Sequence, residues 1–373
     1  MKPLISIVRC SDYDPGLVNE AVEKSISLIG GVGNFVKPGS RMLVKPNLLM
    51  AKEPESAIVT HPHVLRAVIR ILKNINCRIM VGDGPSVWGN QIENVDDVYR
   101  ISGVLKVCRE EDVELVKFEK RRMRKKFPLT AYLDEVDCLV NVPKFKSHEF
   151  TLMSGAVKNL FGLVPGTYKT ELHKNYFDPR SFSNILVDIL YEAKPCFTVV
   201  DGITALEGDG PATSGKIKKL GLLIAGSDCV AIDAVISKIM GIEPFEVFST
   251  RIAADRGLGQ ADINCIKITG ESLAGVIDKT FLLPSNSLIR KKIPGPVKKL
   301  IKRLVRYYPV PLSDKCIRCL ACVKICPSKC ISMSKNGIVF DYKKCIACFC
   351  CQEACPEAAI KVGKSLFARF IGL

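Results

Sequence analysis

The sequence lacks long hydrophobic runs and an apolar leader. Within its 373 residues, no apolar stretch approaches the roughly 18–20 residues that are needed to span a bilayer. The opening residues, MKPLISIVRC, contain one early lysine and a short apolar stretch that is broken by Arg9. This pattern is typical of a first β-strand and not of a signal peptide. We therefore expect a cytoplasmic protein.

The sequence also lacks the short motifs of nucleotide-binding and nucleophilic enzymes. No G-x-G-x-x-G follows a predicted strand and no G-x-x-x-x-G-K-S/T occurs, so neither a nicotinamide nor a nucleotide site is indicated. With only four histidines, the spacing supports no Ser–His–Asp or Cys–His nucleophile. A flavin or another organic cofactor stays open, because flavin sites have no single short motif.

The positive charge is concentrated near the C-terminus. The chain has 54 Lys and Arg against 38 Asp and Glu, a net charge of +16. Residues 286–373 hold 18 basic and 4 acidic residues, a net of +14, which leaves only +2 for residues 1–285. No groove-reading or base-stacking motif accompanies this charge, so we expect no nucleic-acid partner.

Eight of the 17 cysteines form two copies of one spacing. The copies are Cys316-x2-Cys319-x2-Cys322-x3-Cys326-Pro327 and Cys345-x2-Cys348-x2-Cys351-x3-Cys355-Pro356. Bacterial two-cluster ferredoxins hold two 4Fe-4S clusters with this spacing, and the fourth cysteine of each copy binds the other cluster. The expected ligands are Cys316, Cys319, Cys322 and Cys355 for one cluster, and Cys345, Cys348, Cys351 and Cys326 for the other.

Zinc is the main alternative for paired C-x2-C motifs. A zinc ribbon needs four sulfur atoms, and it would leave the other four and both Cys-Pro endings unexplained. Residues 313–363 resemble a two-cluster bacterial-type ferredoxin from end to end, with a hairpin predicted around Asn336-Gly337. Cys330 and Cys350 lie outside the ligand pattern; we expect buried small side chains, with a ligand exchange as the alternative. The same burial is expected for Cys10, Cys77, Cys108, Cys138, Cys196, Cys229 and Cys265.

A basic amphipathic helix is predicted between the two parts of the chain. Between Arg290 and Arg306 lie eight basic residues and no acidic one, and apolar residues repeat at helical spacing up to Tyr308. Three interpretations stay open for residues 290–308. The helix could dock on the N-terminal domain, contact a membrane surface peripherally, or contact an acidic redox partner protein. The predicted organisation is an α/β domain over 1–285, this linker helix within 286–312, the ferredoxin domain over 313–363 and an apolar tail over 364–373.

Residues 1–285 alternate short apolar runs with helical patterns, which indicates an α/β domain with a mostly parallel sheet. The C-terminal domain is expected to be a small ferredoxin-type α+β unit. Candidate strands are Ile5–Val8, Met42–Val44, Arg78–Val81, Cys138–Val142, Phe197–Val200 and Leu220–Ala225, and candidate helices include Gly16–Ile29, Pro62–Ile75 and Val230–Met240.

Charged side chains follow five of these strands, in segments that we interpret as loops. Ligands bind at the carboxyl ends of strands in open α/β sheets, so we expect these groups to converge on one crevice. The predicted ligand-binding residues are Lys45, Asn47, Asp83, Lys144, Lys146, Lys158, Asn159, Glu207 and Asp209. The lysines suit a phosphate or carboxylate group, and His148, His173 and Asp201 are the candidate catalytic residues for proton transfer. Asp228 is interpreted as a helix cap, and His61 as local capping or packing.

The same residues carry a family resemblance. Lys45-Pro46-Asn47, Asn141-Val142-Pro143-Lys144-x-Lys146-x-His148, Lys158-Asn159-Leu160-x-Gly162, His173, Asp201-Gly202-Ile203, Gly208-x-Gly210-Pro211 and Ser227-Asp228-x-Val230-Ala231-x-Asp233 are similar to the family called domain of unknown function 362. The resemblance runs through most of residues 1–270. Members often carry ferredoxin-type domains, so it implies a redox role linked to iron–sulfur clusters, without naming a substrate.

Two functions follow from these observations. In the first, the chain is a redox enzyme, in which two 4Fe-4S clusters feed electrons to a small anionic ligand or cofactor in the Lys/His/Asp crevice. In the second, it is an electron carrier or assembly protein without chemistry of its own, which docks on an acidic or membrane-bound partner. A redox sensor would need an effector-binding element that the sequence does not display. The number of charged side chains at the strand ends favours the enzyme, because a carrier does not need them.

Overall fold

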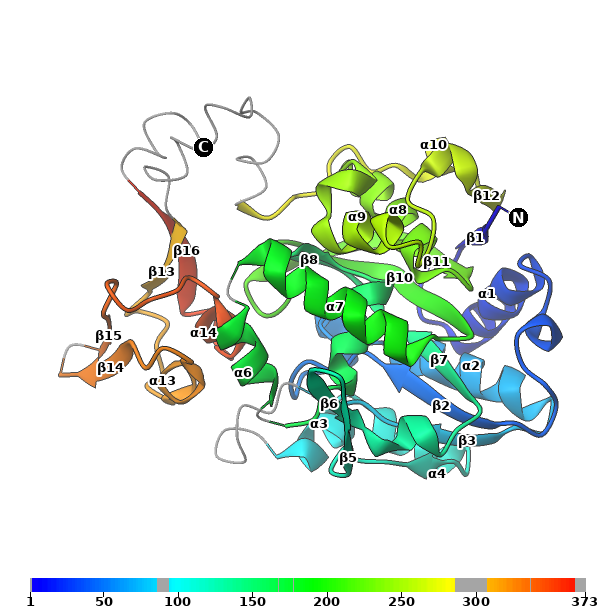
Figure 1. Cartoon of the computed structure of the whole chain (residues 1–373), viewed down its shortest axis with the longest axis horizontal. Coiled ribbons are helices and arrows are strands. Elements are labelled where there is room, and N and C mark those ends of the chain that lie inside the picture. The colour runs from blue at the N-terminus through cyan, green and yellow to red at the C-terminus, as the bar shows by residue number, and fades with distance from the viewer. Residues whose placement is uncertain are drawn as a thin grey trace.

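The computed structural model describes residues 2–85, 94–166, 168–176, 178–285, 307–335 and 337–365. A large α/β domain forms one part, and a small domain with both cysteine motifs lies at one end of it (Figure 1). The predicted basic helix of 290–308 and the apolar tail lie almost wholly outside the described residues. Within the described part, no helix combines the length and apolar character needed to cross a membrane.

The large domain is built on one mixed sheet that is mostly parallel. A sheet of ten strands has the central order β12-β1-β11-β10-β7-β2-β3-β4, with β8 paired to β10 and β9 paired to β8. The bounds are β1 Leu4–Arg9, β2 Arg41–Pro46, β3 Arg78–Val81, β4 Glu114–Leu115, β7 Cys138–Val142, β8 Lys144–His148, β9 Leu152–Ser154, β10 Phe197–Gly208, β11 Gly215–Gly226 and β12 Lys267–Gly270. The predicted α/β class is confirmed, and all six candidate strands are present.

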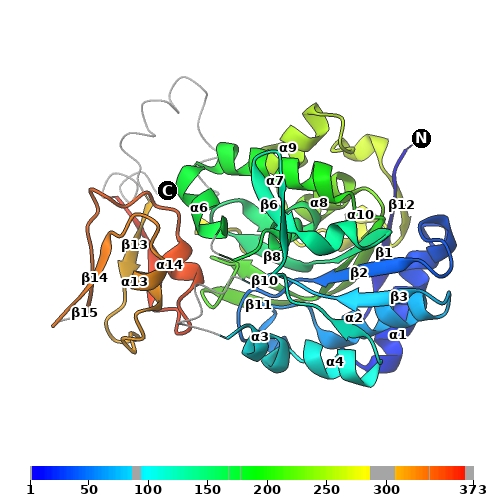
Figure 2. The same cartoon turned by 60° about the horizontal axis from the view of Figure 1, so that its bottom comes forward.

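Helices cover both faces of this sheet (Figure 2). One apolar cluster packs α1 Pro15–Ser27, α2 Pro62–Lys73, α3 Val95–Ile101 and α4 Val104–Glu110 against one face. A second cluster packs α5 Ala156–Asn159, α7 Pro179–Ala193, α8 Cys229–Ile239 and α9 Phe248–Asp255 against the other. The second cluster also takes in residues of α6 Tyr168–Asn175, of α10 Leu273–Val276 and of a hairpin of β5 Arg121–Arg124 and β6 Phe127–Thr130.

Helix starts follow the capping chemistry that the sequence indicates. Asp228 caps α8, because its Oδ1 accepts hydrogen bonds from the backbone N–H groups of Val230 at 2.8 Å and Ala231 at 3.0 Å. At the start of α2, His61 Nδ1 accepts from the N–H of His63 at 3.2 Å, and Pro62 occupies the first helical position. Both residues were predicted to act as local caps, and both do.

Three segments that the sequence analysis interpreted as loops are strands. Lys144–His148 forms β8, which pairs in parallel with β10 and antiparallel with β9. Asp201-Gly202 and Glu207-Gly208 lie inside β10, which continues to Gly208 beside β11. The ladder continues because β8 replaces β7 as the neighbour of β10 once Pro143 interrupts the chain between them.

The expected convergence of five strand ends is therefore only partly right. β2, β3, β7 and β10 run parallel, so their carboxyl ends lie at one edge of the sheet. β11 runs antiparallel to β10, and its last residue, Gly226, pairs with Thr198 near the start of β10. Asp228 thus lies at the opposite edge, as a helix cap.

The small domain contains β13 Tyr307–Pro311, α13 Ala321–Ile325, β14 Ile331–Ser334, β15 Gly337–Phe340, α14 Cys350–Glu353 and β16 Ile360–Lys364. β13 pairs antiparallel with β16. Residues 307–311 were assigned to the linker helix and are a strand, because Pro309 and Pro311 cannot continue a helix. The predicted hairpin is confirmed, with Ile331 opposite Phe340 and Met333 opposite Ile338.

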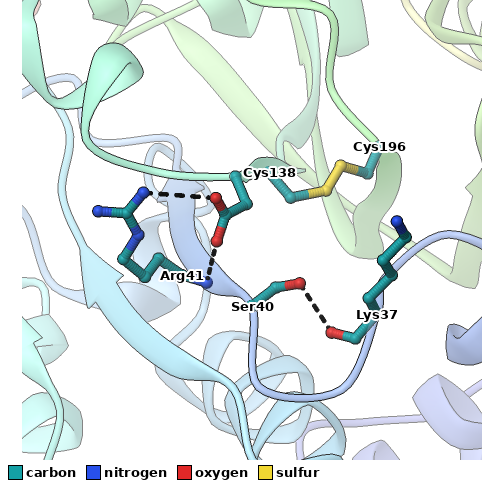
Figure 3. Close-up of a disulfide and its surroundings, with 6 residues drawn as sticks. Lys37, Ser40, Arg41, Cys138 and Cys196 are labelled. Atoms are coloured by element: carbon teal, nitrogen blue, oxygen red, sulfur yellow. Dashed lines mark hydrogen bonds and ion pairs between the residues drawn. A yellow bond between two sulfur atoms is a disulfide. The ribbon is translucent and has the colours of Figure 1, made fainter.

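Two of the cysteines that were predicted to be buried small side chains, Cys138 and Cys196, form a disulfide (Figure 3). Cys138 begins β7 and Cys196 directly precedes β10, and these strands are neighbours in the sheet. Their Cα atoms are 6.0 Å apart, within the range that a disulfide bridges. Burial is also incomplete: Cys77, Cys196 and Cys265 are only partly buried, whereas Cys10, Cys108, Cys138 and Cys229 are buried as expected.

Candidate functional site

Strand β8 directs three of the predicted site residues to one face. Side chains alternate along a strand, so Lys144, Lys146 and His148 share a face while Phe145 and Ser147 point the other way. Phe145 belongs to the apolar core and packs on Phe281. The spacing K-x-K-x-H is therefore explained by strand geometry, which the loop interpretation missed.

Lys144 is held in a buried polar network. It lies opposite Asp201 in the β8–β10 register, and its Nζ is 2.9 Å from Asp201 Oδ2, with both side chains fully buried. Lys144 Nζ also donates to Tyr13 OH at 2.6 Å and to Thr204 Oγ1 at 3.3 Å. Tyr13 OH in turn donates to Asp201 Oδ1 at 2.7 Å. Burial lowers the pKa of Lys144, and the charge of Asp201 partly offsets that effect.

A histidine completes this network from the side. The His61 ring stacks on Tyr13 with 3.7 Å between ring centroids, and the backbone N–H of His61 donates to Asp201 Oδ2 at 2.9 Å. Burial lowers the pKa of His61 to about 4, so the ring is neutral at pH 7. Sequence reasoning missed Tyr13 and Thr204, because no motif marks a tyrosine before a helix or a threonine within a strand.

Lys45 forms a second buried ion pair. Its Nζ lies 2.7 Å from Asp83 Oδ1, and it also donates to Asn159 Oδ1 at 3.3 Å. A Cβ atom on Gly162 would overlap Asp83 Oδ1 and come within 2.6 Å of Lys45 Nζ. The glycine of the Lys158-Asn159-Leu160-x-Gly162 motif therefore provides the space for this ion pair. Lys45, Asp83 and Asn159 stabilise each other and do not stand free for a ligand.

Lys169 is a further buried cation that the sequence analysis did not select. It is 4% exposed, and its Nζ donates to the carbonyl oxygen atoms of Gly84 and Pro85. Burial lowers its pKa to about 8, partly offset by Asp83. A lone lysine on a polar helix such as α6 carries no signal in the sequence that would separate it from a surface residue.

A small cavity opens beside β8. It has an empty volume of about 290 Å³, part of which is open to solvent. Its described lining consists of Asn47, Leu49, Pro143, Lys144, Lys146, Ser154, Gly155, Lys158, Asn159 and Pro211. Five of the nine predicted ligand-binding residues thus meet at one cavity: Asn47, Lys144, Lys146, Lys158 and Asn159.

The two candidate catalytic histidines lie beside this cavity and not among its lining residues. His148 is fully buried, and its Nδ1 accepts from the N–H of Phe150 at 3.1 Å. His173 stacks on Phe182 with 4.4 Å between ring centroids. Burial first, and Lys158 second, lower the pKa of His148 far below its usual range and that of His173 to about 3. Both rings are therefore neutral at pH 7.

The predicted acidic side of the crevice has another role. Glu207 Oε2 accepts from the N–H of Leu282 at 2.9 Å, and Asp209 accepts from the N–H and hydroxyl of Ser285. These carboxylates hold the segment that leads out of the large domain, and neither is among the described lining of the cavity. The position of Glu207 within β10 explains why it could not be placed from a loop interpretation.

The small domain packs on the large one close to this cavity. Glu353 of α14 places Oε1 3.4 Å from His148 Nε2. Thr213 Oγ1 donates to the carbonyl of Cys355 at 2.7 Å, and Lys52 Nζ donates to that of Pro356 at 3.3 Å. Helix α14 therefore lies next to His148 of β8. In Figure 1, α14 is seen beside α6 of the large domain.

The cysteines of the small domain line two separate cavities. Cys316, Cys319, Cys322 and Cys355 line one with an empty volume of about 390 Å³. Cys326, Cys345, Cys348 and Cys351 line the other, of about 280 Å³. Each set is the crossed set that the spacing predicts, and four thiolates around one cavity fit a 4Fe-4S cluster. No group of three or more His, Cys, Asp or Glu residues in the described chain is arranged for a single metal ion.

The two additional cysteines differ in their surroundings. Cys330 is buried in the second cavity, with its Sγ 3.3 Å from that of Cys326. Cys350 is fully buried at the start of α14 and is not among the described lining of either cavity. Both are buried, as predicted, and each is close to a motif cysteine, because the Cys350 side chain hydrogen-bonds with that of Cys348.

Comparisons with known proteins agree with this division. A family model described as "Domain of unknown function (DUF362)" matches residues 42–238, more than half of the chain. A model described as "4Fe-4S dicluster domain" matches residues 309–356. A thylakoid-associated protein of Synechocystis sp. is 32% identical over 262 residues, which are 68% of this chain and 79% of that protein.

Among solved structures, the lactate racemase apoprotein from Thermoanaerobacterium thermosaccharolyticum matches with a TM-score of 0.41 and 12% sequence identity. The match covers 61% of this chain and 55% of that one. The chain thus spans little more than half the length of the racemase.

Proposed function

Because this chain belongs to the DUF362 family and carries a 4Fe-4S dicluster domain with an iron–sulfur electron-transfer role, we propose that it is a redox enzyme. In this proposal, the small domain supplies electrons to a small anionic substrate or organic cofactor in the lysine-lined cavity. The observation that carries it is the packing of α14, which bears the cluster ligand Cys351, against the β8 face beside that cavity. A pure electron carrier does not need such a cavity.

The eight motif cysteines would hold two 4Fe-4S clusters, four thiolates to each. When bound, the clusters supply one-electron transfer. The part of the chain between the thiolates and the cavity is short: Cys351 and Glu353 are two residues apart on α14, and Glu353 contacts His148 on β8. This arrangement supports delivery of electrons toward the large domain.

Proton supply is assigned to the buried network of Lys144, because this residue both lines the cavity and contacts the Tyr13 hydroxyl and the Asp201 carboxylate. Burial lowers its pKa, which brings the ammonium closer to the range in which it gives up a proton. Tyr13 and Asp201 position Lys144 Nζ and take part in returning the proton to it. Asp201, a candidate catalytic residue from the sequence, therefore acts through Lys144.

The test uses protein purified without oxygen, from which small molecules are released by denaturation and identified by mass spectrometry. We expect about eight irons per chain and an anionic organic compound from the wild type. The Lys146→Ala variant should keep its iron and lose the compound, whereas Lys126→Ala, a change at the surface, should keep both. If the wild type is loaded with iron but releases no compound, the proposal of a redox enzyme is contradicted.

A second function is favoured by one specific finding, that the Synechocystis relative is a thylakoid-associated protein. In it, the chain is a cytoplasmic electron carrier or assembly protein that docks peripherally on an anionic membrane or an acidic partner through 290–308. Co-sedimentation with anionic phospholipid vesicles tests it. Binding that weakens steeply between low and high salt supports docking through the basic residues, and absence of binding at low salt contradicts it.

A further inference from the structure

The lysines around the cavity fall into two classes by their partners. Lys45 and Lys144 each have a carboxylate at ion-pair distance, Asp83 at 2.7 Å and Asp201 at 2.9 Å. Both pairs are buried and electrically balanced. Such a lysine has little affinity left for an external anion, because its charge is already compensated.

Lys146 and Lys158 form the second class. Both line the cavity, and neither has a carboxylate oxygen within 4 Å among the described residues. Lys146 is 1% exposed, and its Nζ has one described acceptor, the carbonyl of Ile58 at 2.9 Å. Lys158 is half-buried and has no described hydrogen-bond acceptor. At neither position do acceptors from the described residues match all three N–H donors of an ammonium group.

The electrostatics of this pair favour an anion that carries more than one charge. Burial, followed by repulsion from Lys158 and Lys144, lowers the pKa of Lys146 well below its usual range. Burial also lowers the pKa of Lys158, and Glu353 of α14 offsets part of that effect. One carboxylate across the domain interface does not balance two ammonium groups, of which that of Lys146 is buried and that of Lys158 partly buried. Such groups are costly without counter-charge.

The remaining lining limits the size and the polarity of the ligand. Asn47 contributes a buried Oδ1 without a hydrogen-bond partner. A ligand with an O–H or N–H donor next to its anionic group would satisfy this atom. The room for a ligand is small, because the empty volume of about 290 Å³ includes space that is open to solvent. It suits a small anion or the head group of a larger molecule.

We propose that Lys146 and Lys158 together bind one doubly charged oxyanion, either a phosphate monoester group or a dicarboxylate. This inference rests on the proposed function and names the class of its ligand. In this proposal Lys144 transfers protons, and Lys45 stabilises the lining of the cavity through its contact with Asn159.

The test is isothermal titration calorimetry on the oxygen-free holo-protein at constant ionic strength. The probes are the dianions sulfate, phosphate and malonate, and the monoanions nitrate and acetate. We expect the dianions to bind at least about tenfold more tightly than the monoanions, in line with a charge-assisted contact to a second ammonium. Lys158→Met should weaken the binding of the dianions by about that factor, whereas Lys126→Met at the surface should leave their affinity unchanged.

The outcomes separate the sources and the hypotheses. A preference for phosphate points to a phosphoryl group and a preference for malonate to a dicarboxylate; both keep the proposal. Equal binding of nitrate and sulfate, or unchanged sulfate affinity in Lys158→Met, overturns it. If Lys158→Met fails to fold, protection of Lys158 in the wild type from reductive methylation by sulfate, mapped by mass spectrometry, gives the same decision, and no protection overturns it.

The same protein separates this inference from the proposed function. If dianions bind at Lys158 but the wild type releases no organic compound, the anion site is supported and the proposal of a redox enzyme is contradicted. A released compound that carries no dianionic group, together with no sulfate binding, would do the reverse.

Discussion

The buried ion pair of Lys45 and Asp83 offers the sharpest test of the site's architecture. Lys45→Met leaves a carboxylate that is 2% exposed, and Asp83→Asn leaves a lysine that is fully buried. Removing one partner of a buried pair costs about 3–5 kcal/mol. The backbone N–H groups of Leu48 and Gly84 still donate to Asp83, and the carbonyl of Pro46 still accepts from Lys45. We therefore expect the lower end, about 3 kcal/mol for each single variant.

Urea unfolding followed by circular dichroism measures this cost, while the cluster absorbance reports separately on the small domain. With a slope of about 3 kcal/mol per molar urea, each single variant should lower the midpoint by about 1 M. The double variant should cost clearly less than the sum of the two, because it leaves no unpaired buried charge. Arg100→Met at the exposed pair with Asp97 is the control and should cost about 0–1 kcal/mol.

Two results would refute this reasoning. If Lys45→Met shifts the midpoint no further than Arg100→Met does, the pair is not buried in solution. If the double variant costs the sum of the singles, the two charges are not coupled. Gly162→Ala gives an independent check without changing any charge, because its added Cβ would displace Asp83 Oδ1. It should destabilise the large domain by an amount similar to the single variants.

Three further outcomes are expected. Cys322→Ala should lower the iron content by about half, whereas Cys330→Ala should leave it near eight; loss of iron in Cys330→Ala would indicate a ligand exchange. Burial raises the pKa of Asp233 to about 7, so the folded state holds this proton more tightly than the unfolded chain. As pH rises from about 4 to 7, the free energy of unfolding of the wild type should therefore fall by up to about 4 kcal/mol relative to that of Asp233→Asn. Parallel curves of unfolding free energy against pH for the two proteins would refute this. Alkylation before reduction should leave Cys138 and Cys196 unmodified in intact-mass measurements. Labelling of both cysteines would show that the disulfide is absent.

Much of this fold could be predicted from periodicity and spacing. The apolar runs from Ile5 to Ala225 mark strands because short buried β-strands need continuous apolar segments. The crossed cysteine sets follow from a spacing that serves one kind of site, and the hairpin around Gly337 follows from its turn chemistry. These features are local, so the sequence carries them directly.

The direction of β11 and the extent of β10 could not be predicted in the same way. Whether Gly202 ends a strand or lies within one depends on which neighbour the ladder finds beyond Val200, and that neighbour is β8. The acidic groups were misplaced for this reason. Glu207 lies along a strand that continues past the crevice, and Asp228 lies at the far edge because its strand returns antiparallel.

The break at Pro143 connects these observations to the cavity. It ends β7 and lets the next residues form β8, which runs beside the continuing β10. This places Lys144 against Asp201, and it gives Lys146 a position on the same face without a carboxylate of its own. Two lysines that look equivalent in sequence therefore differ in chemistry: one is tied into a proton-bearing network, and the other is left to compensate an incoming anion.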